Sequence, residues 1–364
     1  MKRNNIEPYE KCLCGSGKKF KFCCYKNKDL EFHNVNEACN YSKKNVPKLS
    51  FCIHADNDCD KEIINSHSIQ NNKIISKLSV DNHTYIIDFS SQTGFLGNDF
   101  KIISRNKATT SKSFCSYHDN KIFKPIECSD YLNNEEQNFL FAYRAFSKHY
   151  FDNQRSLKEQ QVIFKARPKA YISNSGMVTH LKGLYIEKEK HENLRLKFNS
   201  ALDSKNFSFI KTYVIELNYE IQFATAYMAP LSYDLKGNQV SDLYSLIDDM
   251  KYIFVTMFPE NGKSYILISW LFEDNEYLKE FINQVDMIKK DKSKLFNVLN
   301  NLLASQSDNF VISPNMLESW DESQKKNFLA IFTATFVGIG DIRNIGQEIE
   351  KNLERSPCKF NLFQ

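Results

Sequence analysis

The chain has 364 residues, of which 42% are hydrophobic and 25% are charged, a composition typical of a globular protein with a packed core. This length suggests two or three domains. A net charge of +4, from 48 basic and 44 acidic residues, is too small to indicate nucleic-acid binding by itself. The small numbers of glycine (11) and proline (8) argue against a long disordered chain and against a turn-rich β-sandwich.

The sequence contains no run of about 18 apolar residues, so neither a membrane span nor a membrane partner is expected. Its first residues, Met1-Lys2-Arg3, lead into a polar stretch without the apolar core of a signal peptide. We therefore expect a cytoplasmic protein, in which thiols stay reduced and ten cysteines indicate metal binding rather than disulfides. Eight of the ten lie at or before Cys115, so metal chemistry is predicted for the N-terminal third.

The first predicted element is a compact metal site within thirteen residues. Its four thiols are those of Cys12, Cys14, Cys23 and Cys24. Zinc takes four such ligands in a tetrahedron, and the intervening Gly15-Ser16-Gly17 lets the backbone reverse without a Cβ penalty. So short a segment cannot fold by burying apolar surface, so a bound metal must supply its folding energy.

The same segment resembles the SEC-C motif, which runs Cys-X-Cys, then Gly-Ser-Gly-Lys-Lys-X-Lys-X-Cys, then Cys or His. Residues 12–24 match at essentially every defined position. The family includes the tail of a bacterial translocase ATPase, where the module contacts protein partners and the ribosome. The chain has no Walker-type phosphate loop, which excludes a translocase. The resemblance implies a docking module with a closed zinc site, because four thiolates leave the ion no open position.

Lysines accompany this module, and no acidic residue lies between Lys11 and Lys28. We define Lys18, Lys19 and Lys21 as the basic patch. Such a patch can meet an acidic protein surface, a ribosome or a nucleic acid, and the sequence does not choose among them. Residues 29–48 are polar and rich in asparagine, which predicts a linker.

A second, split zinc site of the Cys3His type is predicted downstream. Its candidate ligands are Cys52, Cys59, Cys115 and His118. Cys115-X2-His118 is a usual half-site, whereas six residues between Cys52 and Cys59 make a longer spacing than is common. His54 is an alternative ligand in place of either cysteine of that first pair.

This arrangement looks like the zinc-stapled HNH (ββα-metal) nucleases, where a cysteine pair precedes a strand ending in Ser/Asp-His-Ile and a second pair opens a helix. Ser66-His67-Ser68-Ile69 matches that strand. The resemblance implies that His67 is a general base and that Asp119 is the first helix ligand of Mg²⁺ or Mn²⁺. The next expected helix ligand is Phe123. The strand asparagine of the family has several candidates, namely Asn71, Asn72, Asn82 and Asn98. The alternative is a zinc-stapled domain without catalysis.

The remaining two thirds of the chain gives a pattern of helices and strands. Apolar residues spaced by three and four predict a helix over 135–166. Strands are predicted at 207–218, 221–227, 252–258 and 264–272, with a hairpin at Asn261-Gly262 because both residues tolerate positive φ. Helices follow at 275–303 and 321–336. On the helix at 135–166, Arg144 could contact phosphate, but a solvent-exposed face is the simpler interpretation.

Together these features predict an α+β protein. The predicted parts are a SEC-C zinc module at 1–28, a linker at 29–48, an HNH-like zinc-stapled domain at 49–130 and an α+β domain with antiparallel strands at 135–364. The leading hypothesis is a cytoplasmic zinc-binding protein whose SEC-C module docks onto a protein, a ribosome or a nucleic acid, either DNA or RNA. The alternative is an HNH-like, metal-dependent endonuclease acting on DNA.

Overall fold

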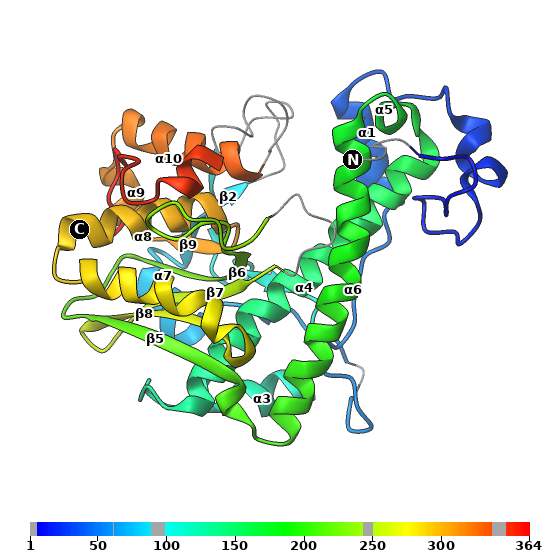
Figure 1. Ribbon diagram of the computed structural model, residues 1–364. Coiled ribbons are helices and arrows are strands. Elements are labelled where there is room, and N and C mark those ends of the chain that lie inside the picture. Colours follow the sequence, from blue (N-terminus) through cyan, green and yellow to red (C-terminus); the bar gives the residue numbers. More distant parts are fainter. Residues whose placement is uncertain (1–5, 61, 89–98, 243–249, 337–346) are drawn as a thin grey trace. The chain divides into compact units, whose positions relative to one another are not determined.

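The computed structural model describes residues 6–60, 62–88, 99–242, 250–336 and 347–364. It confirms an α+β fold with antiparallel strand pairing (Figure 1). The described residues form two compact units, the first from 6–50 and 150–197 and the second from the remainder. The change from the first unit to the second at Ser50 and Phe51 lies close to the predicted boundary at 49, and the first unit also takes in residues 150–197 of the predicted C-terminal domain. Within the described ranges, every helix is too short or too polar to cross a lipid bilayer.

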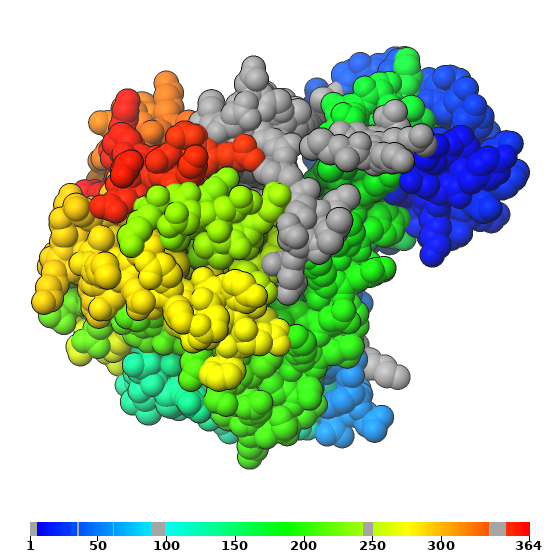
Figure 2. All heavy atoms as spheres, viewed as in Figure 1, coloured from blue at the N-terminus to red at the C-terminus, as the bar shows by residue number. Residues whose placement is uncertain are grey.

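Helices and the N-terminal cysteine segment build the first unit. Its helical elements are η1 (Phe20–Phe22), η2 (Cys24–Asn27), α1 (Val35–Asn45), the later part of α4 (Glu135–Ala166), α5 (Lys169–Ile172) and most of α6 (Ser175–Asp203). The bounds of α4 agree with the sequence prediction. Helix α6 was not predicted, although Val178, Leu181 and Leu184 form a buried stripe along it. In the space-filling view, the N-terminal residues (dark blue) present an exposed surface of this unit (Figure 2).

Helix α1 lies inside the segment predicted to be a linker. Asn34 caps it by accepting a hydrogen bond from the backbone N–H of Glu37 at 2.9 Å. Ser42, on the buried side of α1, donates a hydrogen bond to Glu159 of α4. One of the asparagines that suggested a linker is therefore a helix cap, which is a common use of this residue.

A seven-stranded antiparallel sheet in the order β3-β2-β9-β6-β7-β8-β5 forms the centre of the second unit. The strands are β2 (His83–Asp88), β3 (Asp99–Ser104), β5 (Ile210–Leu217), β6 (Phe223–Pro230), β7 (Tyr252–Glu260), β8 (Lys263–Leu271) and β9 (Phe310–Ile312). The β7–β8 hairpin turns at Asn261 and Gly262, whose φ angles are 52° and 77°, as predicted. The predicted start of β5 is instead a short 3-10 turn, η4 (Phe207–Phe209).

The central strands of the sheet are buried on both faces, as strand β7 shows. Ile253, Val255 and Met257 belong to the core shared with the C-terminal helices. Phe254 packs on Phe198, at the end of α6, with a ring-centroid distance of 5.5 Å. Alternation along a strand sends neighbouring side chains to opposite faces, so this sheet lies between two apolar layers.

The C-terminal helices cover one of these faces (Figure 1). They are α7 (Asn275–Ile288), α8 (Lys292–Gln306), α9 (Pro314–Ser319) and α10 (Glu322–Phe336), with η5 (Phe272–Asp274) before them. The single helix predicted over 275–303 is two helices. The break occurs where Asp291 caps α8 by accepting from the N–H of Lys294 at 3.2 Å.

Residues 49–130 contribute to two structures rather than to one. Strands β2 and β3 join the large sheet, because Tyr85 of β2 pairs with Ile312 of β9 and Ile87 enters its core. A two-stranded sheet of β1 (Ser66–His67) and β4 (Thr110–Ser111) precedes helix α3 (Ser116–Glu127). The turn η3 (Asn71–Ile75) and the short helix α2 (Ser76–Leu78) lie between β1 and β2.

Candidate metal centres and a buried His-Asp pocket

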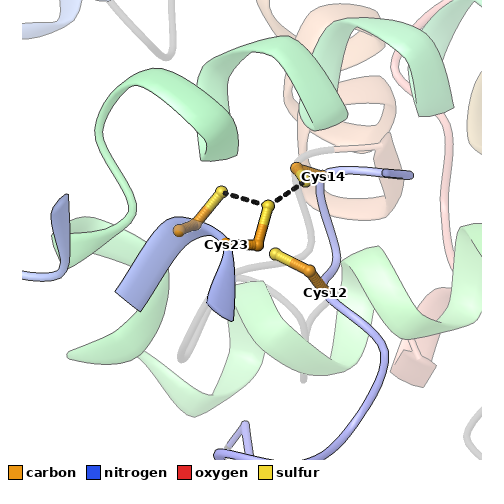
Figure 3. A group of neighbouring side chains, drawn as sticks. Cys12, Cys14 and Cys23 are labelled. Carbon is orange, nitrogen blue, oxygen red and sulfur yellow. Dashed lines mark hydrogen bonds between the residues drawn. The ribbon is translucent and has the colours of Figure 1, made fainter. Parts of the chain in front are cut away.

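The structure brings together the four thiols of the first predicted site. The sulfur atoms of Cys12, Cys14, Cys23 and Cys24 all lie within 4.8 Å of one another. Figure 3 shows those of Cys12, Cys14 and Cys23 pointing toward a common centre. The Cys14–Cys23 and Cys23–Cys24 sulfur distances are 3.5 and 3.8 Å. Tetrahedral zinc with sulfur ligands requires about 3.8 Å, so the donor set fits this ion. We call it the first metal centre.

A tight hairpin places these thiols. The backbone N–H of Cys12 donates to the carbonyl of Lys18 at 2.7 Å, which closes the loop between the two halves of the site. Gly15 and Gly17 have φ angles of 77° and 74°, a region that costs other residues about 1–2 kcal/mol. At Gly15 a Cβ atom would also lie only 2.7 Å from the side chain of Gln161.

The hairpin packs against helices of its own unit. Phe20 is buried, and its ring centroid lies 6.2 Å from that of Phe164 on α4. Tyr185 of α6 donates its hydroxyl to the carbonyl of Leu13 at 2.9 Å. Cys12 and Cys24 share this core. The module therefore has one packed face, and the basic-patch residues Lys18, Lys19 and Lys21 are exposed.

Close contact between thiols changes their acidity. A hydrogen bond from Cys24 lowers the pKa of Cys12 to about 5. The same hydrogen bond raises the pKa of Cys24, which acts as the donor. The thiolate is the form that binds metal, and a cation at this point would favour it at the other positions too.

The second predicted ligand set also comes together. The ligand atoms of Cys52, Cys59, Cys115 and His118 lie within 4.8 Å of one another, and we call this the second metal centre. The Cys52 and Cys115 sulfurs are 3.7 Å apart. His118 Nδ1 lies 3.5 Å from the sulfur of Cys52 and 3.2 Å from that of Cys115. A Cys3His donor set is a common closed zinc site.

Local structure explains how distant residues meet at this centre. Cys115 is the N-cap of α3, and its sulfur accepts from the backbone N–H of His118 at 3.4 Å. The chain around Cys52 lies beside the strand leading into α3, because the N–H of Ile53 donates to the carbonyl of Ser113 at 2.9 Å. This backbone pairing brings Cys52 to Cys115, although the two cysteines are more than 60 residues apart in the sequence.

Asp56 and His54 surround the outer side of His118. The carboxylate of Asp56 lies 3.0 Å from His118 Nε2, the nitrogen that faces away from the thiols. A carboxylate in this position orients a metal-binding histidine. His54 was an alternative ligand in the sequence. The Nε2 atom of His54 lies 3.2 Å from Asp203. His54, Asp56 and His118 form another group whose possible metal-binding atoms lie within 4.8 Å of one another, and this group shares His118 with the second metal centre.

His67 and Asp119 line one small pocket beside the second metal centre. Ser66 and His67 come from β1, and Asp119 from the first turn of α3. Arg144 and Lys148 of α4 complete its charged lining. The strand pair β1–β4 and helix α3 supply further lining residues of this pocket.

Several buried polar atoms of this pocket have no hydrogen-bond partner among the described residues. They are Ser66 Oγ, His67 Nδ1, Asp119 Oδ1 and Arg144 Nε. An unsatisfied buried polar atom costs about 1–3 kcal/mol, so a cluster of four calls for a physical explanation. A bound ion or substrate with polar groups would satisfy them.

The pocket also sets the protonation state of its two candidate catalytic residues. Burial lowers the pKa of His67, and a hydrogen bond between its ring and the backbone of Ala108 opposes this shift. Nδ1 has no hydrogen-bond partner in the described part of the chain, so in the neutral ring it can serve as an acceptor. Burial raises the pKa of Asp119, while the positive charge of Arg144 acts in the opposite direction.

Arg144 is the pocket residue that sequence reasoning misplaced. It is 4% exposed, ion-paired with Glu127, and its guanidinium lies 4.1 Å from the ring centroid of Phe123. The solvated face predicted for it is therefore wrong. The position of Arg144 relative to Phe139, Leu140 and Phe146 did not predict its burial. Helix α4 has 32 residues and contacts different segments along its length, so its buried side changes.

The further HNH ligands have no counterpart in the described pocket. Phe123, at the second helix position, is 1% exposed and packs in the core. Asn71, Asn72 and Asn82 lie in the described part of the chain, and none of them lines the pocket. Asn98 lies outside the described residues.

Comparison of the chain with protein-family models, with curated proteins and with solved structures finds no match.

Proposed function

We propose that the second unit is a metal-dependent phosphodiesterase with an HNH-like site, in which His67 is the general base. One observation carries this proposal. His67, Asp119 and Arg144 line one buried pocket, and His67 Nδ1 has no hydrogen-bond partner among the described residues. A general base needs such an unoccupied acceptor nitrogen beside the groups that hold the substrate.

In this proposal His67 and Arg144 have different roles in phosphodiester hydrolysis. His67 accepts a proton from an attacking water at Nδ1, and its lowered pKa keeps the ring neutral near pH 7. Arg144 supplies a positive charge beside the phosphate. The ion pair between Arg144 and Glu127 holds the guanidinium in place.

Asp119 is the residue that would hold the divalent cation of this reaction. Its buried Oδ1 has no partner in the described ranges, and a carboxylate oxygen is a preferred ligand of Mg²⁺ and Mn²⁺. When bound, such an ion stabilises the negative charge that develops on the phosphate. The second metal centre is a zinc site in this proposal, and it fixes the start of α3 and therefore Asp119.

The test compares His67→Ala with His83→Ala, a change of an exposed histidine on β2 in the same unit. We expect wild-type protein to cut plasmid DNA with Mg²⁺ or Mn²⁺, and His67→Ala to lose at least about 100-fold in rate. Zinc content should stay unchanged in both variants. Wild-type protein that cuts neither DNA nor RNA with either ion refutes the proposal, as does full activity of His67→Ala.

We also propose, as a second function, that the N-terminal module docks onto a macromolecule. The specific support is its two-sided construction, in which Phe20 packs inward while Lys19 and Lys21 are exposed. Docking requires the folded module, so Cys12→Ser with Cys14→Ser should abolish it. His67→Ala should leave docking intact, which separates this function from hydrolysis.

A further inference from the structure

Three large aromatic side chains are exposed on the N-terminal module. Tyr9, Phe22 and Tyr25 are 59%, 68% and 40% exposed. Tyr9 and Phe22, together with Lys19 and Lys21, form what we call the aromatic–lysine face. Phe20 is the aromatic residue buried in the module core, and Tyr25 packs edge-on against it at a centroid distance of 5.7 Å, so Tyr25 is left out of this face.

The lysines of this face lie over the aromatic rings. The ammonium of Lys21 is 5.1 Å from the ring centroid of Tyr9 and 6.0 Å from that of Phe22. Lys19 lies 5.5 Å from the Tyr9 ring. The Tyr9 and Phe22 rings meet edge-on with a centroid distance of 6.5 Å. Apolar ring faces and positive charges therefore occupy the same small area.

Lysines outnumber acidic residues around this face. No acidic residue occurs between Lys11 and Lys28, and the acidic residues next to Tyr9 are Glu7 and Glu10. The nearby carboxylate of Glu10 is already engaged, because Lys182 of α6 lies 3.1 Å from it. An anionic partner can therefore form ion pairs with Lys19 and Lys21. Acidic side chains have no flat surface that could stack on the aromatic rings.

We infer that the aromatic–lysine face binds single-stranded nucleic acid. The inference rests on the proposed docking function and names its partner. Bases stack on exposed aromatic rings, while lysines contact the phosphates between them. A duplex keeps its base faces covered, so the unpaired strand is the form that uses both parts of this face. An acidic peptide matches the lysines only.

The experiment measures fluorescence anisotropy of a labelled oligo(dT) or oligo(U) of about 12 nucleotides. Full-length, zinc-loaded protein carries His67→Ala and is used without Mg²⁺ or Mn²⁺, so hydrolysis cannot interfere. We expect Phe22→Ala to weaken binding about fivefold or more. The double change Lys19→Gln with Lys21→Gln should lower the slope of log affinity against log salt by about 1.4.

The matched control is Phe272→Ala. Phe272 is 56% exposed and also has a lysine over its ring, with Lys211 Nζ at 5.1 Å, but it belongs to the second unit. Its replacement should leave affinity unchanged. Zinc content, measured for every variant, shows that the module remains folded.

Three results overturn the inference in different ways. Equal affinity of Phe22→Ala and the parent protein shows that bases do not stack on this face. A second result is that the protein binds a poly-glutamate peptide and not the oligonucleotide, and that the double lysine variant loses this binding. This result would exclude nucleic acid as the partner but would support docking through this face. If neither probe binds, docking through this face fails as well.

Discussion

Asp56 shows how one exposed residue acts on a metal centre that it does not enter. Its carboxylate meets His118 Nε2 at 3.0 Å, and the opposite nitrogen of the same ring faces the thiols of Cys52 and Cys115. Asp56 lies within ion-pair distance of Nε2, and Nδ1 is the ring nitrogen on the side of the thiols. Outer-shell partners of this kind typically change metal affinity by 10–100-fold.

At this scale we predict that Asp56→Ala lowers zinc affinity at the second metal centre by about 10–100-fold. Asp58→Ala is the control, because Asp58 lies in the same loop, and its backbone N–H donates to Asp56 at 2.9 Å. Competition with a chromogenic chelator measures both. Equal affinities of the two variants would show that Asp56 does not orient His118.

The pairing of α4 and α6 in the first unit includes a buried carboxyl group. Glu187 of α6 accepts a hydrogen bond from the side-chain amide of Asn153 on α4 at 2.8 Å. Burial raises the pKa of Glu187 above its ordinary 4.5. The folded state therefore holds this proton more tightly than the unfolded state. The stability that this proton provides is complete below pH 4.5 and is lost as pH rises through the folded pKa.

For this helix pair we predict that Glu187→Gln is more stable than wild type at pH 7, because glutamine keeps the hydrogen bond and carries no charge. The expected gain is about 2 to 4 °C in Tm, and it should disappear below pH 4.5. Circular-dichroism melts of zinc-loaded protein measure it. Glu189→Gln, at an exposed position on α6, should show no such pH dependence. A gain that persists at pH 4 would contradict the assigned cause.

At the scale of the whole molecule, the two candidate metal centres differ in how far apart their ligands lie in the sequence. The first uses ligands within thirteen residues, and the second joins Cys52 to Cys115. A local centre orders a local hairpin. A long-range centre closes a large loop of the chain, so a metal bound there would stabilise the arrangement of strand β1, strand β4 and helix α3.

We predict two zinc ions per chain, measured by mass spectrometry of the purified protein. Cys12→Ser with Cys14→Ser should leave one, and Cys52→Ser with Cys115→Ser should also leave one. Removal of zinc by a chelator should unfold the N-terminal hairpin, because so short a segment has little apolar core of its own. A single ion in wild-type protein, unchanged by the second pair of substitutions, would remove the second centre.

The sequence by itself indicated features that depend on near neighbours. The ligands of the first metal centre, the span of helix α4 and the turn at Asn261-Gly262 all follow from residues a few positions apart. The ligands of the second centre were predicted from the cysteine pair and the Cys115-X2-His118 half-site. The roles of His67 and Asp119 came only from the resemblance to HNH proteins.

Only the tertiary structure decided which distant elements meet. It placed β2 and β3 in the large sheet through Ile312, more than 220 residues away, and turned Arg144 into the pocket of His67. It also set Asp56 behind His118 and left Phe22 exposed while Phe20 is buried. Periodicity and spacing report the local backbone, whereas strand order and the choice of buried face depend on packing between segments far apart in the chain.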